Sequence, residues 1–352
     1  MRRHCCNLRT LELPSHAATK PAYIASLPPS IQILKIHHAS SFSEATLIKL
    51  SQTHLPHLHT LALVRSLIKN KELSYLPRNL VHLSLEGSFL ISGADSSFTA
   101  LPSSLRTLSL AWCSNLVPFS LAHLPQSITS LDLSNCSRLQ GEALRSLPTS
   151  LRALDVSGSE ISSESLAGLP NTLTHLTTSS FHDGTLPPQI KSLHLSKSPA
   201  NLSALPQQLS TLSLTNMMTT DEELSFVPLS LRSLSIVNCP KLTSEGKLHY
   251  TTTLHYTTPH YTTPHFTTYT LLSAGVGKVI KGLQLERLCL ASPLRNDGHM
   301  FRPAFMPGFN DDLLQFLPDT LRQLEVHGTL ITKLGVRVLP TRILVRYNPL
   351  ST

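Results

Sequence analysis

The chain has 352 residues, of which 41% are hydrophobic, 5% aromatic and 14% charged. Its net formal charge of +8 includes no block of Lys and Arg, which argues against nucleic acid as a partner. The sequence contains neither an apolar run of about 18 residues nor a signal-peptide core, which argues against membrane insertion. Its six cysteines are scattered. We therefore expect an intracellular, cytoplasmic protein, with the nucleus as the alternative location.

One leucine motif recurs along the chain. Its clearest copy is Leu101–Leu110, LPSSLRTLSL, which reads Leu-Pro-x-x-Leu-x-x-Leu-x-Leu. Weaker copies at 8–13, 58–63 and 285–290 keep the three later leucines without the leading pair. The other copies begin at Leu27, Leu76, Leu124, Leu147, Leu169, Leu186, Leu205, Val227 and Leu317, and a degenerate one begins at Leu339. Thirteen copies and a degenerate fourteenth indicate a protein built from stacked repeats.

The leucine spacing predicts a short strand and a return segment in each copy. The last two leucines are two residues apart, so they share one face of the strand and point into the core. Successive strands can pair only in parallel, because each return segment runs on the far side. Leucines three apart, such as Leu144 and Leu147, predict a helical return segment with one buried side. We expect capping boxes at Ser41–Glu44 and Thr220–Glu223, and an N-cap at Asn310.

Three copies place a cysteine three residues after the third leucine, at Cys113, Cys136 and Cys239. The segment Leu131–Cys136 therefore reads Leu-x-Leu-x-x-Cys. This pattern resembles the cysteine-containing leucine-rich repeats of ribonuclease-inhibitor-like and F-box-associated proteins. The leading Leu-Pro-x-Ser-Leu is similar to FNIP-type repeats of amoebae and to bacterial Leu-Pro repeats, although Phe309-Asn310 continues as Asp311-Asp312 and the FNIP signature is absent. The resemblance implies an α/β right-handed solenoid, with a parallel sheet on the concave face and short helices or extended segments on the convex face.

Two insertions interrupt the repeats. The tract at 248–278 repeats His-Tyr-Thr-Thr, and we predict that it forms a disordered loop. It separates leucine-rich repeats at 1–247 from C-terminal repeats and a cap at 279–352. A shorter insertion, predicted to be a surface loop, falls within 291–309.

The outward-facing residues of the strands supply the candidate binding surface. The residue after the first leucine is basic in seven copies, which favours an acidic protein segment as the partner, and Asp132 and Asp155 form a central acidic pair. Any single arginine has a simpler alternative role, which is to solvate the sheet. The lone tryptophan is a candidate anchor or a packing residue. The candidate protein-binding residues are Arg106, Arg152, Lys191, Arg232, Arg322, Asp132, Asp155 and Trp112.

The cysteines are predicted to be structural. The repeat position of Cys113, Cys136 and Cys239 makes them buried spacers in a turn. Cys289 lies between Leu288 and Leu290, so it is expected to face outward as an exposed free thiol. We expect no metal and no cofactor.

These features predict a non-enzymatic, monomeric module that binds a protein partner on the concave face. Gly-rich phosphate loops, Cys-x-x-Cys, His-Glu-x-x-His and Gly-x-Ser-x-Gly motifs are absent from the sequence. The resemblance to F-box-associated repeats implies a narrower role for the module, as the substrate receptor of a ubiquitin ligase. We expect the F-box itself to be missing, because only seven residues precede Leu8. The alternatives are a GTPase-activating or ligase-type leucine-rich-repeat protein, and a truncated gene product without a specific function.

Overall fold

A computed structural model describes residues 7–14, 21–179, 181–182, 185–196, 200–237, 239, 280, 283–291, 311–327 and 333–348. The tract at 248–278 and the N-cap predicted at Asn310 lie outside these residues, and the predicted division of the chain at 247 and 279 stays a prediction. The chain forms two compact units, which we describe separately. Unit 1 comprises Met1–Ser179 and Gly184–Gln189, and unit 2 comprises Ser180–Asp183 and Ile190–Thr352.

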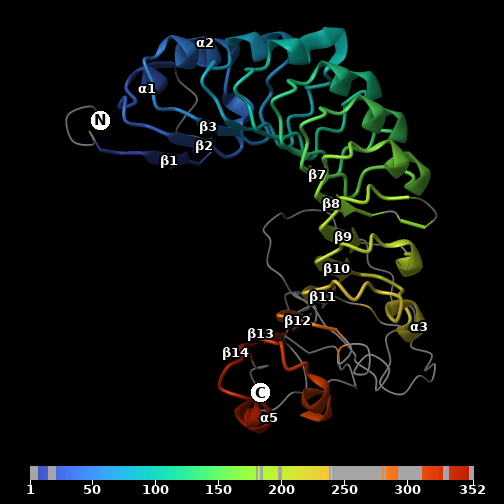
Figure 1. The fold of residues 1–352 in the computed structure, drawn as a ribbon. Helices are drawn as coiled ribbons and strands as arrows, with labels where there is room; N and C mark the ends of the chain where they lie inside the picture. Colours follow the sequence, from blue (N-terminus) through green and yellow to red (C-terminus); the bar gives the residue numbers. More distant parts are fainter. Residues whose placement is uncertain are drawn as a thin grey trace, which may run out of the picture. The chain divides into compact units, whose positions relative to one another are not determined.

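Eight strands of unit 1 follow one another in chain order, and each pairs in parallel with the next (Figure 1). This confirms the pairing predicted from the motif. The strands are β1 (Thr10–Leu13), β2 (Ile33–Ile36), β3 (Thr60–Leu63), β4 (His82–Ser84), β5 (Thr107–Ser109), β6 (Ser130–Asp132), β7 (Ala153–Asp155) and β8 (His175–Thr178).

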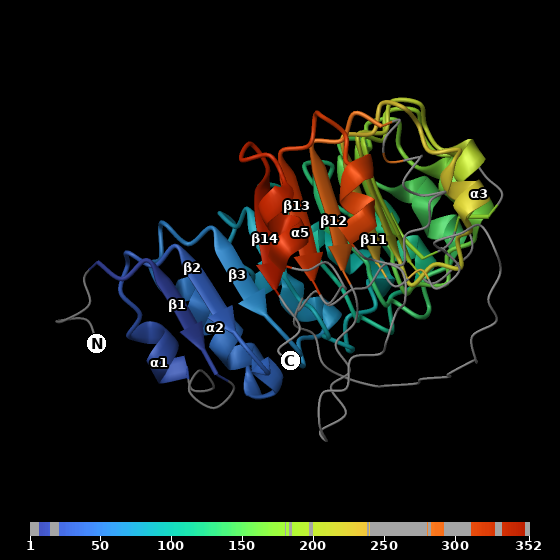
Figure 2. The same cartoon turned by 90° about the horizontal axis from the view of Figure 1, so that it is seen from below.

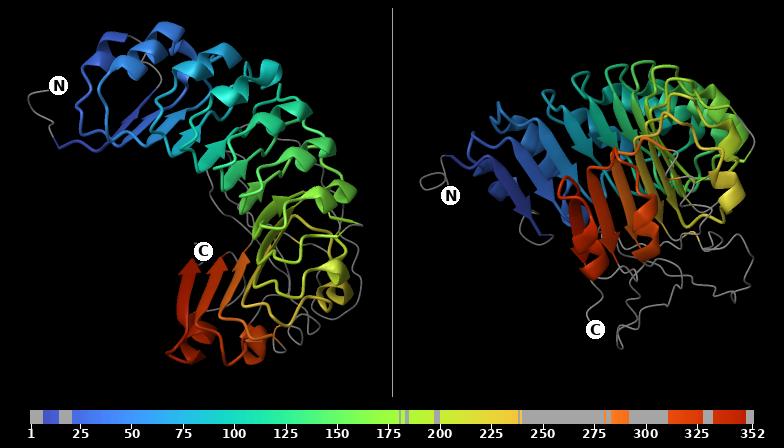
Figure 3. Two further views of the ribbon diagram at one scale, coloured as in Figure 1. Left: turned by 45° about the horizontal axis from the view of Figure 1, so that its top comes forward. Right: turned by 60° about the horizontal axis from the view of Figure 1, so that its bottom comes forward.

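Six parallel strands form unit 2 in the same way, and the last three appear side by side in orange and red in Figure 3. The degenerate fourteenth copy therefore contributes a full strand. The strands are β9 (Ser192–Ser196), β10 (Thr211–Thr215), β11 (Ser233–Val237), β12 (Arg287–Ala291), β13 (Gln323–His327) and β14 (Leu344–Asn348). The pairing of β11 with β12 brings together segments that lie on either side of the 248–278 tract in the sequence.

Leucine burial follows the predicted alternation. In β5, Leu108 is fully buried between the half-exposed Thr107 and Ser109. Leu105 and Leu110 of the same copy are also fully buried. Each buried leucine contributes about 1.5–3 kcal/mol relative to an exposed one, so the repeated motif supplies the core of each unit.

The return segments lie on the side of the sheet opposite its outward face (Figure 2). Most are single 3-10 helices rather than α-helices, because residues three apart line up in a 3-10 helix. Leu144 lies inside one of these helices and Leu147 is the extended residue that follows it, and both are buried. The 3-10 helices are η1 (Ala39–Ser41), η2 (Asn70–Tyr75), η3 (Ala94–Ala100), η4 (Pro118–His123), η5 (Gly141–Ser146), η6 (Ser163–Gly168), η7 (Leu202–Ala204) and η8 (Asp311–Phe316).

Four α-helices have described bounds, and two of them test the predicted caps. They are α1 (Pro21–Ala25), α2 (Glu44–Gln52), α3 (Asp221–Leu224) and α5 (Lys333–Val338). The capping box before α3 is confirmed, since the Thr220 side chain accepts from the Glu223 amide and the Glu223 carboxylate accepts from the Thr220 amide. The box predicted at Ser41 is wrong. Ser43 caps α2 by accepting from the Thr46 amide, because Ser41 is already used in η1.

A ladder of hydroxyl groups explains the fourth residue of Leu-Pro-x-Ser-Leu. The Ser104 hydroxyl donates to the carbonyl oxygens of Arg78 at 2.9 Å and Leu80 at 2.6 Å in the preceding repeat. Thr172 repeats this arrangement with Thr149 and Leu151, both at 2.8 Å. Ser30, Ser150, Ser230 and Thr320 make the corresponding contact to the first leucine or isoleucine of the repeat before them. This side chain therefore joins successive repeats outside the strand ladder.

A second ladder explains the cysteine position. The Cys136 thiol donates to the Leu110 carbonyl at 3.2 Å, and the Cys113 thiol donates to the Leu85 carbonyl at 3.4 Å. In the following copy a serine takes over, and the Ser159 hydroxyl donates to the Leu133 carbonyl at 2.7 Å. In these copies the position holds a small side chain that donates a hydrogen bond to the preceding repeat, whereas Ala39, Phe181 and Met217 fill it elsewhere as buried apolar residues.

Candidate protein-binding surface

The five predicted basic residues occupy one edge of the strands, which we call the leading edge because each strand begins there. Each of these residues comes immediately before a strand, and its side chain is exposed. Their backbone carbonyls link neighbouring repeats; that of Arg106, for example, accepts from the amides of Thr129 at 2.8 Å and Ser130 at 3.0 Å. The basic column therefore runs along the leading edge and not across the middle of the outward strand face. Its members are Arg106, Arg152, Lys191, Arg232 and Arg322.

Positive charge on the leading edge is uncompensated in unit 1. The Nη1 atom of Arg106 donates to the carbonyl of Ser127 at 3.2 Å and lies 3.5 Å from that of Leu105. Neither Arg106 nor Arg152 forms an ion pair with any described residue. In unit 2, Arg232 pairs with Glu286 at 3.1 Å, whereas Lys191 and Arg322 form no ion pair with any described residue.

Two pockets open along the leading edge, one in each unit. The pocket of unit 1 has a volume of about 230 Å³ and is lined by Asn7, Arg9, Ser30, Gln32 and His57. The pocket of unit 2 has a volume of about 500 Å³ and is lined by Arg232, Glu286, Asp319, Thr320, Leu321, Arg322 and Arg342. The leading edge is thus hollowed at one place in each unit.

Sequence reasoning missed Glu286 because it belongs to a weak copy of the motif. It follows the first leucine of that copy, Leu285, and so occupies the same repeat position as Arg232 and Arg322. Aligning the weak copy position by position would have revealed a carboxylate inside the basic column. Asp319 and Arg342, which come from Leu-Pro turns, carry no comparable signal.

The acidic pair lies on the strand face and is engaged in local turns. Asp132 and Asp155 are directly opposite in β6 and β7. Asp132 accepts from the amide and hydroxyl of Ser134 at 3.0 and 2.7 Å, and Asp155 accepts from those of Ser157 at 2.8 and 2.6 Å. Burial raises the pKa of Asp155, although its bonds to Ser157 oppose that shift. These hydrogen bonds hold the turn that follows each strand, and a role of the acidic pair in binding stays a prediction.

Trp112 lies at the opposite edge, where the strands end. Its backbone is left-handed, with φ of 60°, and its amide donates to the Ser134 carbonyl at 2.8 Å. Its side chain is 45% exposed. The sequence alone left open whether this ring packs on a neighbouring turn or reaches solvent, and the structure places nearly half of it in solvent.

The thiols of the repeat are buried as predicted, which suits a structural role. Burial raises the pKa of Cys113 and of Cys136 to about 12 and that of Cys239 to about 11. These thiols stay protonated and unreactive at neutral pH. Cys289 faces outward between two buried leucines, but it is only partly exposed, and burial raises its pKa to about 11. The expected outward-facing free thiol is therefore present, but its exposure is intermediate.

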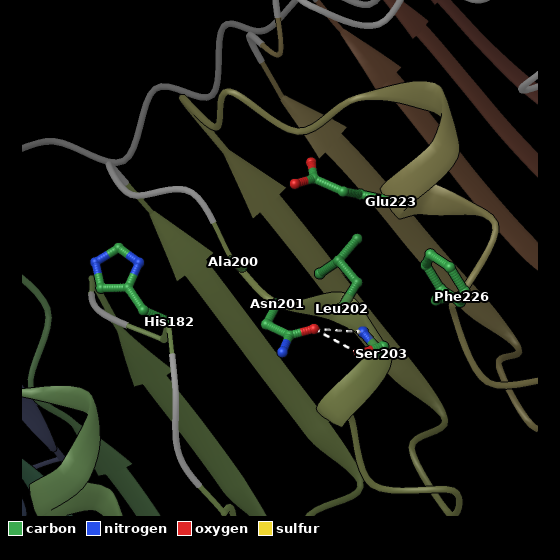
Figure 4. Close-up of a pocket in the computed structure, with 7 residues that line it drawn as sticks. All are labelled: His182, Ala200, Asn201, Leu202, Ser203, Glu223 and Phe226. Carbon is green, nitrogen blue, oxygen red and sulfur yellow. Dashed lines mark hydrogen bonds between the residues drawn. The ribbon is translucent and has the colours of Figure 1, made fainter.

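A further pocket of about 430 Å³ lies in unit 2, among residues that follow strands (Figure 4). Its polar groups already bind their own chain. Asn201 accepts from the amide and hydroxyl of Ser203 at 3.1 and 2.6 Å, and Glu223 caps α3. Phe226, at 54% exposed, adds an apolar wall. Across the described part of the chain, no group of three or more His, Cys, Asp or Glu side chains is placed to hold a metal ion.

None of the helices in the described ranges is long and apolar enough to cross a bilayer. No family model matches the sequence, and no curated protein matches it. The comparison with solved structures does find similar folds.

An internalin (inlF) from Listeria monocytogenes is 17% identical and has a TM-score of 0.51, over 97% of this chain and 88% of that chain. The leucine-rich repeat-containing protein LegL7 from Legionella pneumophila is 19% identical with a TM-score of 0.46, over 65% and 90%. CroV588, described as a novel circular leucine-rich-repeat protein, is 15% identical with a TM-score of 0.36, over 89% and 52%.

The likeness to the internalin agrees with the parallel strands and buried leucines, so the protein has the leucine-rich-repeat fold. At this level of identity the comparison shows the fold alone. The closer resemblance to ribonuclease-inhibitor-like, F-box-associated and FNIP-type repeats stays a prediction.

Proposed function

We propose that this protein is a non-enzymatic module that binds an acidic segment of a partner protein along the leading edge. The observation that carries the proposal is the uncompensated positive charge at Arg106 and Arg152, whose side chains are exposed and form no ion pair with any described residue. These residues stand two repeats apart, a separation of about 10 Å that one extended peptide can span.

The repeat architecture supports a binding role. A strand face rich in Ser, Thr and Ala lies beside the column and offers hydroxyl groups to an extended segment. Guanidinium groups bind carboxylates in a paired geometry, and such charge-assisted bonds are stronger than neutral ones.

The narrower role of a ubiquitin-ligase substrate receptor draws on the cysteine position of the repeat. That position is accounted for by the hydrogen bond to the preceding repeat, so it adds no support for one partner class over another. Neither a GTPase-activating role nor a ligase role is favoured by a specific observation. A monomer in the cytoplasm remains our expectation.

The test is a double charge reversal, Arg106→Glu with Arg152→Glu. Both side chains are exposed, so the fold is expected to persist, as circular dichroism can verify. Loss of two charge-assisted contacts and the added repulsion should weaken capture of partners by at least about a hundredfold. Partners would be captured from cell extract with the full chain and identified by mass spectrometry.

The matched control is Arg138→Glu with Arg145→Glu. These exposed arginines lie in a turn and in η5, away from the leading edge, and the substitution changes the net charge by the same amount. We expect the control to retain the partners. If the control loses them and the leading-edge variant keeps them, the partner binds elsewhere and the proposal is wrong.

A further inference from the structure

The leading-edge pocket of unit 2 gathers five charged side chains from four repeats. Arg232, Glu286 and Arg322 occupy equivalent positions before β11, β12 and β13. Their backbones adjoin, since the Glu286 amide donates to the Arg232 carbonyl at 2.8 Å and the Arg322 amide donates to the Glu286 carbonyl at 3.0 Å. The Leu-Pro turns of the last two repeats add Asp319 and Arg342 to the lining of the same pocket.

Two of the three arginines in this pocket are already paired. Arg232 binds Glu286 at 3.1 Å, and Arg342 binds Asp319 at 3.0 Å. Arg322 forms no ion pair with any residue that the structure describes. Three guanidinium groups against two carboxylates leave one positive charge, and this charge belongs to Arg322.

We propose that this pocket receives one carboxylate from an acidic side chain of a partner protein, with Arg322 as its direct ligand. The inference rests on the proposed function and names the place in unit 2 where the acidic segment is held. A guanidinium group presents parallel N–H donors that match a carboxylate, and Arg322 is the member of the set whose donors are not shared with an acid. The pocket's volume of about 500 Å³ admits a side chain of this size.

Charge matching favours a carboxylate over a phosphate group. A phosphorylated side chain carries about two negative charges at neutral pH and is usually bound by a cluster of arginines. Here Glu286 and Asp319 neutralise two of the three arginines, and both carboxylates would repel a dianion. A single negative charge balances the one that remains.

The experiment uses the full chain labelled with ¹⁵N and three small probes. N-acetylglutamate α-amide carries one carboxylate, its glutamine analogue carries none, and N-acetylphosphoserine amide carries the dianion. Each probe is titrated while the arginine Nε–H signals are followed by NMR, with the Arg322 signal assigned from the variant Arg322→Gln. We expect the glutamate probe to shift the Arg322 signal saturably, and the other two to bind at least about tenfold more weakly.

Two variants sharpen the result. Arg322→Gln should abolish the response of the remaining pocket signals to the glutamate probe. Glu286→Gln frees Arg232 and removes a repulsive charge, so it should tighten binding of the glutamate probe about three- to tenfold. Arg138→Gln, in a turn away from the leading edge, is the control and should leave that affinity unchanged.

The assignment to a carboxylate is overturned if the glutamine analogue shifts Arg322 as strongly, or if the phosphoserine probe binds more tightly than the glutamate probe. It is also overturned if Glu286→Gln leaves the affinity unaltered. Because the probes are small molecules, this result is independent of partner capture. If the NMR titration fails while the Arg106 and Arg152 variant loses its partners, the carboxylate site at Arg322 is rejected and the proposed function stands.

Discussion

At the scale of single residues, serine hydroxyl groups form hydrogen bonds between repeats that the leucine motif does not predict. Ser104 and Ser127 stand at the same repeat position, yet their surroundings differ. Ser104 donates to two carbonyls, whereas the buried hydroxyl of Ser127 has no hydrogen-bond partner among the described residues. The guanidinium of Arg106 lies within reach of the Leu105 carbonyl, which is the acceptor that the ladder would offer to Ser127.

This contrast predicts different costs for one and the same substitution. Ser104→Ala removes the hydroxyl donor that the Arg78 and Leu80 carbonyls share, so we expect the free energy of unfolding to fall by about 1–2 kcal/mol. Ser127→Ala removes a buried hydroxyl without a partner, so it should be neutral or slightly stabilising. Urea unfolding followed by circular dichroism measures both variants. Equal losses in the two would show that the ladder contributes nothing specific.

At the scale of elements, the turn after each strand requires a left-handed residue. This residue lies two positions after the third leucine, and its φ is positive in every copy where the structure describes it, at His38, Arg65, Gly87, Trp112, Asn135, Gly158 and Asn216. Its amide donates to the next repeat, as Asn135 does to the Ser157 carbonyl at 2.7 Å. The turn is thus set by contact with the neighbouring repeat, because several of these residues do not favour that conformation on their own.

Two glycine substitutions separate this requirement from a simple change in size. At Gly158, φ is +71° and an added Cβ would lie 2.2 Å from Oδ1 of Asn135. We expect Gly158→Ala to lower the free energy of unfolding by about 1–2 kcal/mol or more. Gly168, inside η6, does not have a positive φ, and an added Cβ would meet only the flexible side chain of Arg145 at 3.3 Å. Gly168→Ala should therefore cost nothing or stabilise slightly. Thermal unfolding compares them, and equal losses would argue against the left-handed requirement.

At the scale of the whole molecule, the repeats continue across the His-Tyr-Thr-Thr tract. β11 pairs directly with β12 in register from Ser233 opposite Arg287 to Val237 opposite Ala291. The repeats on the two sides are stacked as if the intervening sequence were absent. The tract carries no copy of the leucine motif.

Deleting residues 248–278 should therefore leave the fold intact. We expect the free energy of unfolding to change by no more than about 1 kcal/mol, since the closure entropy of a loop depends weakly on its length. Thermal unfolding of the deleted and full chains by circular dichroism measures this. A much larger loss would mean that the tract packs against the repeats, and the prediction of a disordered loop would then be wrong.

The sequence by itself determined the repeat, the position and parallel pairing of the strands, the leucines of the core and the burial of Cys113, Cys136 and Cys239. These follow from local rules, because alternation along a strand places every second side chain in the core. Only the tertiary structure decided which charged side chains form ion pairs or hydrogen bonds within the protein and which do not. The partners of Arg232 and Asp132 depend on the neighbouring repeat and on the turn after the strand, and Glu286 reaches Arg232 across 54 positions of sequence. The spacing of leucines carries no information about such contacts, because they are set by side-chain reach between stacked repeats.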